Sequence, residues 1–168
     1  MDRLKNIIIS ILSVLCILSM IVMIFSISYK PNKVEFVPPK FESAVIKGRP
    51  ELQPEYDWSE VYQEGMNYRV GICTKVTVYE DVADVYFSNT KDNMVWLKLR
   101  VLDEDNNIIG ETGLIKPDEY VKAVNLNGNF QDGQKIKLKI MAYEPETYYS
   151  EGSIILNTII KRVEYDGV

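Results

Sequence analysis

The N-terminal part of the chain contains a long stretch without any charged side chain. No charged residue occurs between Lys5 and Lys30, and the 24 residues between them are mostly isoleucine, leucine, valine, methionine and serine. A helix rises about 1.5 Å per residue, so about 20 apolar residues cross the ~30 Å hydrocarbon layer of a bilayer. Because a backbone in lipid must satisfy its own hydrogen bonds, the stretch predicts a transmembrane helix within residues 1–29.

Two interpretations of this helix remain open. Ser26-Ile27-Ser28 has the small-x-small pattern of a signal-peptide cleavage site. The apolar run, however, exceeds the roughly 7–15 residues usual for a signal peptide, which favours an uncleaved signal anchor. Basic residues flank the helix on both sides, so the positive-inside rule is nearly balanced. The short leading tail favours a single pass through the cell membrane with an extracytoplasmic C-terminal domain.

Residues 30–65 are rich in proline and predict a stalk that holds the domain off the bilayer. Proline removes a backbone donor and favours extended conformations in its neighbourhood. Near the end of this stretch, Trp58, Val61 and Tyr62 are spaced at i, i+3 and i+4. We therefore expect one or two helical turns over 54–62, packed as a lid on the following domain.

From residue 66 to 168 the apolar residues recur with period two. The clearest case is 135–140, where lysines alternate with isoleucine and leucine. Turn-forming residues separate such runs at even spacing, which is typical of antiparallel β structure. The predicted fold is all-β: an Ig-like antiparallel β-sandwich of about seven strands, with a small closed barrel as the alternative. The expected strands cover 67–79, 82–88, 94–102, 108–112, 120–126, 135–143 and 154–163.

Composition argues against several classes of function. The chain has no histidine, which removes the commonest general base at neutral pH and most zinc sites. Its net charge is -5, and the part after the N-terminal segment sums to -6, so we expect no nucleic-acid partner. The acidic run 103–107 lacks the glycine and glutamate of an EF-hand and is interpreted as a hairpin turn. We expect no enzyme activity, no cofactor and no metal site.

Two segments carry a resemblance to a known group of proteins. Residues 108–121 (IIGETGLIKPDEYV) and 138–147 (LKIMAYEPET) resemble segments of small membrane-anchored Ig-like surface proteins of low-GC Gram-positive bacteria. The resemblance covers about residues 96–160 and implies an Ig-like module behind a membrane segment. Its motifs are strand and turn patterns, so it implies no catalytic residue.

Exposed aromatic residues are the candidates for recognition. The alternation places Trp96 on the polar face with Lys98 and Arg100, where the lid around Trp58 or a partner would cover it. Such rings anchor protein partners or stack on sugars. We expect a non-enzymatic, membrane-anchored cell-surface protein that binds an envelope protein; the alternative is a carbohydrate-binding module for a cell-wall polymer. The candidate recognition surface comprises Trp96, Tyr120, Tyr143, Tyr148 and Tyr149.

Overall fold

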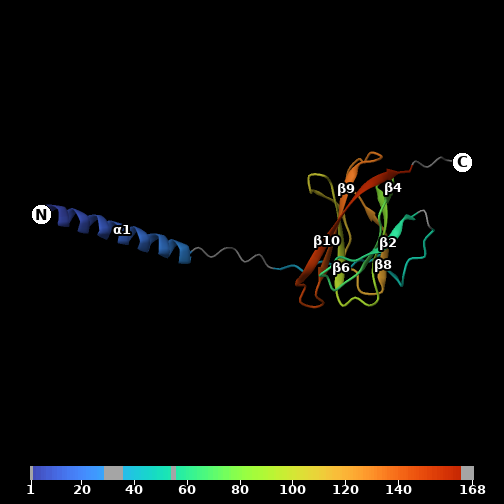
Figure 1. Cartoon of the computed structure of the whole chain (residues 1–168), viewed down its shortest axis with the longest axis horizontal. Helices are drawn as coiled ribbons and strands as arrows, with labels where there is room; N and C mark the ends of the chain where they lie inside the picture. Colours follow the sequence, from blue (N-terminus) through green and yellow to red (C-terminus); the bar gives the residue numbers. More distant parts are fainter. Residues whose placement is uncertain (1, 29–35, 54–55, 164–168) are drawn as a thin grey trace. The chain divides into compact units, whose positions relative to one another are not determined.

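The computed structural model describes residues 2–28, 36–53 and 56–163, in two compact units, Met1–Val37 and Pro38–Val168. The first unit contains helix α1 (Asp2–Ser28) (Figure 1). Within it, Arg3–Ile27 is long and apolar enough to cross a membrane, with a mean hydropathy of 3.1. A signal sequence has the same properties. The predicted N-terminal apolar helix is therefore confirmed.

The described residues of the second unit form ten strands. Their order in the sheet is β1-β8-β5-β4-β10-β9-β6-β7, with β3 attached to β5 and β2 attached to β3. The strands are β1 (Ile46–Lys47), β2 (Trp58–Val61), β3 (Val70–Cys73), β4 (Val76–Tyr79), β5 (Val82–Asn89), β6 (Trp96–Leu102), β7 (Ile108–Glu111), β8 (Glu119–Asn125), β9 (Lys135–Tyr143) and β10 (Ser150–Arg162).

Strand β10 joins the two halves of this sheet (Figure 1). Residues from Ser150 to Ile159 pair antiparallel with β9, whereas Ile160 to Arg162 pair parallel with β4. The sheet curls, so the apolar faces of its two halves meet in one core. Side chains that are fully buried there include Tyr68, Ile72, Phe87, Leu97, Leu99, Ile136, Leu138, Ile140 and Ile160.

The mostly β architecture confirms the coarse prediction, but the strand count differs from the seven expected. The predicted strand 67–79 is two strands, β3 and β4, because the chain turns at Thr74 and Lys75. The remaining difference comes from the predicted stalk, which contributes β1 and β2. The β4–β10 pair is parallel, which period-two patterning in the sequence does not reveal.

Strand β2 lies where helical turns were expected. Positions 54 and 55 are outside the described residues, but Trp58–Val61 is a strand whose residues pair with β3, Trp58 opposite Cys73 and Val61 opposite Val70. Three apolar residues over one turn are a weak helix signal, and the edge of β3 offers unpaired backbone groups instead. The segment does cover the domain, as a strand rather than as a helical lid.

Candidate binding surfaces

Three of the five candidate aromatic residues come together on the outer face of β6 and β9. Trp96 and Tyr143 are direct partners in the β6–β9 ladder. The Tyr148 ring lies edge-on to Trp96 with a centroid distance of 5.4 Å, and the Phe41 ring contacts Trp96 in the same way at 4.8 Å. These four rings form the aromatic patch. Phe41 and Tyr148 contact Trp96. The expectation that the segment around Trp58 would cover it was wrong, because Trp58 belongs to β2 and packs over β3.

The other two candidates are placed differently. Tyr149 follows Tyr148 in the loop before β10, and 72% of it is exposed. Tyr120 lies on β8, opposite Ile46 of β1 and Ser88 of β5, in the half of the sheet that does not carry Trp96. Sequence alone did not separate Tyr120 from the others because the strand order was unknown.

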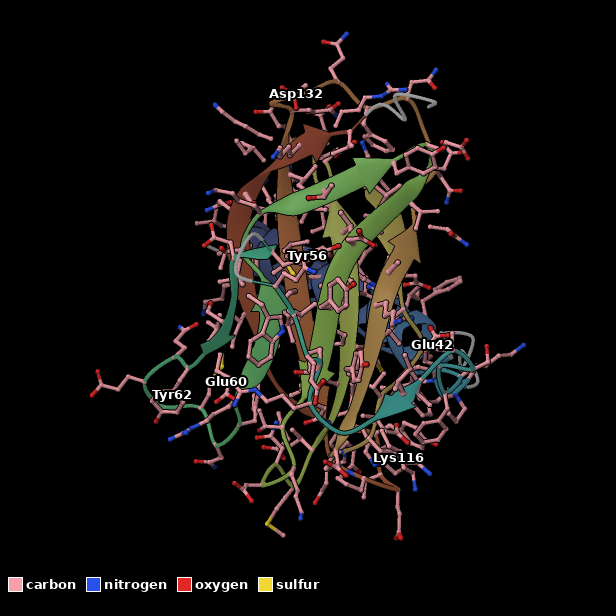
Figure 2. The ribbon with its side chains drawn as sticks, turned by 90° about the vertical axis from the view of Figure 1, so that its right-hand side faces the viewer. Glu42, Tyr56, Glu60, Tyr62, Lys116 and Asp132 are labelled. Atoms are coloured by element: carbon pink, nitrogen blue, oxygen red, sulfur yellow. The ribbon has the colours of Figure 1, made fainter. Side chains whose placement is uncertain are left out.

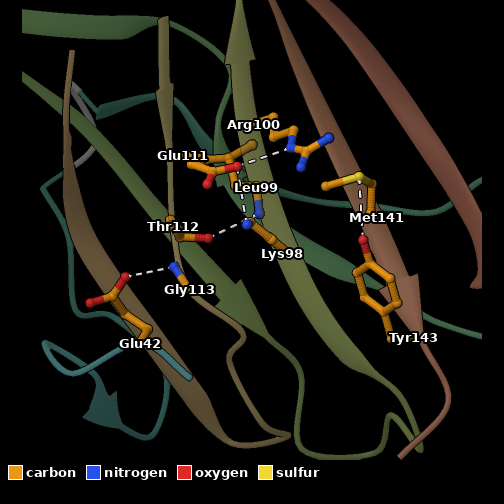
Figure 3. Close-up of polar contacts among 9 residues, drawn as sticks. All are labelled: Glu42, Lys98, Leu99, Arg100, Glu111, Thr112, Gly113, Met141 and Tyr143. Atoms are coloured by element: carbon orange, nitrogen blue, oxygen red, sulfur yellow. Dashed lines mark hydrogen bonds and ion pairs between the residues drawn. The ribbon is translucent and has the colours of Figure 1, made fainter. Parts of the chain in front are cut away.

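Basic side chains continue the same outer face. The Nζ atom of Lys98 and the Nε atom of Arg100 each lie 3.0 Å from the Oε2 atom of Glu111 (Figure 3). Burial raises the pKa of the Glu111 carboxyl, but the two cations outweigh it and the pKa is lowered. One carboxylate is thus shared by two cations, which leaves a net positive charge at this point of the face.

Strand β9 extends this charge. Arg100 pairs with Lys139, and the alternation of β9 places Lys137 and Lys135 on the same side of the sheet. Lys98, Arg100, Lys135, Lys137 and Lys139 form the cationic ladder. The negative net charge of the chain gave no sign that basic residues gather on one face, since net charge carries no information about which face holds the cations.

A second feature ties the segment after Pro38 to the domain. The Glu42 carboxylate accepts hydrogen bonds from the backbone N–H groups of Gly113 at 2.8 Å, Ser43 at 2.8 Å and Ala44 at 3.1 Å (Figure 3). The Glu42 N–H donates to the Leu114 carbonyl at 2.9 Å. A Cβ atom at Gly113 would lie 2.5 Å from the Glu42 nitrogen, so this close approach requires glycine. We call this arrangement the Glu42 clasp.

Replacing Glu42 by glutamine is expected to cost about 1–2 kcal/mol at neutral pH, because charge-assisted hydrogen bonds become neutral ones. Burial raises the pKa of Glu42, but the backbone hydrogen bonds outweigh it and the pKa is lowered. Its contribution to stability is therefore present above the unfolded-state pKa and is lost as pH falls through the lowered folded-state value. Urea unfolding of the full chain in micelles at about pH 6 and about pH 3 measures this loss.

The matched control is Glu64→Gln, which alters an exposed carboxylate outside the clasp. The control should keep the pH dependence of the unaltered chain, whereas Glu42→Gln should reduce it. Equal pH dependence in all three proteins would contradict the role assigned to the clasp.

A polar cleft of about 760 Å³ opens on the other half of the sheet. It is bordered by residues 48–49, the strand β2 and its following loop, the segment 66–69, the segment 88–93 that includes the end of β5, and Asp118. Figure 2 shows Glu60 and Tyr62 on one flank of the domain, with Glu42 and Lys116 on the opposite flank. Sequence analysis missed this cleft, because its residues come from five separate segments and share no motif.

Trp58 is held rigidly at the edge of the cleft. Its indole Nε1 donates to the carbonyl of Tyr86 at 2.9 Å. Its ring occupies the position that a side chain at Gly71 would take. Tyr86 has a φ of 41°, which is unusual for a bulky residue and marks the bulge in β5. The Arg49 guanidinium lies 4.8 Å from the centroid of the Trp58 ring. Trp58 is therefore a fixed wall rather than a free stacking surface.

Two buried asparagines hold the loop on the opposite side of the cleft. The Asn93 side chain donates to the Asn89 Oδ1 atom at 2.6 Å and to the Arg69 carbonyl at 2.6 Å, and it accepts from the Arg69 N–H at 2.9 Å. The Asn89 amide donates to the carbonyls of Val95 at 2.8 Å and Ile115 at 3.2 Å. These bonds link segment 88–93 to three other parts of the chain and fix the shape of the cleft.

Other groups with potential chemistry are placed in structural positions. The Cys73 thiol is fully buried, and burial, followed by Asp84 and Asp57, raises its pKa to about 12. Asp103 accepts hydrogen bonds from the backbone and side chain of Asn107, as in a hairpin turn. Within residues 2–28, 36–53 and 56–163, no group of three or more Cys, Asp or Glu side chains is arranged to hold a metal ion.

Comparisons with known proteins assign no family to the chain. No protein-family model matches it, and no curated protein matches it. Among solved structures, CopC from Methylosinus trichosporium OB3b is similar to 54% of this chain over 84% of its own length, with 11% sequence identity and a TM-score of 0.33. A likeness at this level carries no functional information.

Proposed function

We propose that this chain is a membrane-tethered, non-enzymatic interaction module of the bacterial envelope, with its β domain outside the cytoplasm. Its ligand would be an acidic segment of an envelope protein. The observation that carries the proposal is the joining of the aromatic patch and the cationic ladder on one face of β6 and β9. The apolar helix Arg3–Ile27 supports the tether.

The composition of this face suits a protein partner. Aromatic residues and arginine are enriched at the centres of protein interfaces, where they provide most of the binding energy. Trp96 and Tyr143 supply aromatic rings. The cationic ladder begins two residues after Trp96, at Lys98, and ends at Lys135. Complementary charge on the partner would speed association and fix its orientation.

An Ig-like β-sandwich fold for the β domain is part of the same proposal. A core shared between two halves of a curled, mostly antiparallel sheet supports it. The resemblance of residues 108–121 and 138–147 to anchored surface proteins points to the same location. The proposal also includes retention of the helix as an anchor, rather than its cleavage after Ser28.

Charge reversal on β9 is expected to abolish partner capture. In cells that express the full chain, photo-crosslinking from position 143 should recover one envelope protein, and Lys135→Glu with Lys139→Glu should lower its yield at least about tenfold through lost charge complementarity. Lys122→Glu, an exposed lysine on β8, is the matched control and should leave the yield unchanged. Recovery unaffected by the double reversal would reject this face as the docking surface.

The alternative function, binding of a carbohydrate, has less support than protein binding at the loop that carries Tyr148 and Tyr149. Tyr148 packs edge-on against Trp96, whereas Tyr149 presents an exposed ring. Recognition of a sugar needs directed hydrogen bonds beside a stacking ring. The arrangement of the polar cleft meets that requirement better.

A further inference from the structure

We propose that the polar cleft beside Trp58 binds a neutral, hydroxyl-rich ligand, namely one or two sugar units of a glycan. This site is separate from the aromatic patch and does not depend on the function proposed for that surface. Its volume of about 760 Å³ lies within the range of about 300–1,000 Å³ found for small-molecule sites.

The cleft is preorganised. On one side the Trp58 indole is fixed by its hydrogen bond to the Tyr86 carbonyl. On the other side the Asn89–Asn93 pair fixes the loop that carries Thr90. A site whose walls are held by packing and hydrogen bonds loses little conformational entropy when it binds a ligand.

The charges that line the cleft balance each other. Three are positive and three are negative, so the cleft carries no net formal charge. One of the pairs is already formed, since an Arg49 nitrogen lies 3.6 Å from the Glu60 carboxylate. A strongly charged ligand would therefore meet as much repulsion as attraction, whereas a neutral polar ligand finds both donors and acceptors. The charged lining residues are Arg49, Arg69, Lys91, Glu60, Asp92 and Asp118.

Two residues that line the cleft carry buried hydroxyl groups without hydrogen-bond partners. The Tyr68 hydroxyl and the Thr90 Oγ1 atom are buried, and neither has a partner within the described part of the domain. A buried unsatisfied polar group destabilises the folded state, so native proteins contain few of them. Because both residues line the cleft, a ligand hydroxyl that reached them would relieve this cost. A hydroxyl is both donor and acceptor, which suits it to another hydroxyl.

An open aromatic ring completes the lining. Tyr62 lies on the segment that borders the cleft, and 59% of it is exposed (Figure 2). The apolar face of a sugar ring can stack on such a ring while its hydroxyls bond to Asn67 and the groups beneath. Neutral charge, unpartnered hydroxyls and one open ring together select a carbohydrate over a peptide or a phosphate.

The test uses the full chain in micelles of a detergent without a sugar headgroup. The probes are immobilised neutral oligosaccharides of one to three hexose or N-acetylhexosamine units. Binding is expected, and Tyr62→Ala, Tyr68→Phe and Thr90→Val should each lower it at least about tenfold, a loss of about 1.4 kcal/mol or more. Tyr149→Ala is the matched control, since it removes an exposed tyrosine that does not line the cleft, and it should leave binding unchanged.

Tyr68→Phe separates binding from folding. It removes an unpartnered buried hydroxyl and keeps the ring, so the unfolding midpoint should stay the same or rise while binding falls. Absence of binding to every neutral probe would overturn the proposal, as would loss of binding in Tyr149→Ala with full binding in Tyr68→Phe. Neither outcome alters the expected capture of a protein through β9.

Discussion

Replacing Gly71 by alanine is expected to destabilise the β domain by about 3 kcal/mol or more, as severe overpacking does. A Cβ atom at this position would overlap Trp58 Cζ2 and Ser88 Oγ. The indole cannot simply move aside, because its Nε1 is bonded to the Tyr86 carbonyl. Gly71 is also paired on both sides, with Glu60 of β2 and Ser88 of β5, so the backbone cannot move away either. Urea unfolding of the full chain, followed by tryptophan fluorescence, measures the effect.

A double-mutant cycle tests the cause of this loss. Trp58→Ala removes the ring that the new methyl group would strike. In that background Gly71→Ala should cost less than about 1 kcal/mol, which is a strong coupling between the two positions. Additive costs would show that the loss comes from the overlap with Ser88 or from the backbone at Gly71, and not from the packing of Trp58.

Replacing Asn89 by leucine is expected to cost about 3–5 kcal/mol, because three hydrogen bonds are lost in a buried environment. The change would leave the carbonyls of Val95 and Ile115 without the Asn89 donor, and the Asn93 amide without its acceptor. Asn89 is 1% exposed, so water cannot replace these bonds without opening the core. The same unfolding measurement gives the loss of free energy.

Two further variants separate hydrogen bonding from size. Asn89→Asp keeps the shape but removes both donors, so it should be destabilising as well. Asn157→Leu, on an exposed position of β10, should change stability by no more than about 0.5 kcal/mol. A stable Asn89→Asp variant would mean that the two carbonyls find other donors and that Asn89 acts through packing.

Much of the fold was predictable because the pattern of β9 is strong. Alternating lysines and aliphatic residues over 135–140 define which face is buried, and the structure confirms a strand there. The predicted strands at 82–88, 94–102 and 108–112 also correspond to β5, β6 and β7 within a few residues. Local periodicity succeeds where one face of a strand meets the core and the other meets water.

The segment before residue 66 was harder to interpret because its structure depends on distant partners. Nothing in the sequence around Trp58 indicates that β3 has a free edge or that Gly71 leaves room for an indole. Prolines in this segment favour extended backbone, which suits a spacer and an added edge strand equally well. The β1 strand likewise exists because β8 offers pairing opposite Tyr120.

The candidate sites divide in the same way. Trp96 was predictable as a surface residue from alternation, and its pairing with Tyr143 follows from the β6–β9 register. The polar cleft was not predictable, since Tyr68 and Thr90 come together only through the strand order. Net charge was a poor guide to the cationic ladder, because it sums over faces that point in different directions.

The double role of β10 affects how the protein is made. This strand follows all the other described strands in the chain, yet it sits between β4 and β9 in the sheet. While the polypeptide emerges from the ribosome, the edges of β4 and β9 stay unpaired until residues 150–162 have been synthesised. Exposed edges are templates for aggregation, so slow delivery of the final strand is the stage at which nascent copies are most vulnerable to joining one another.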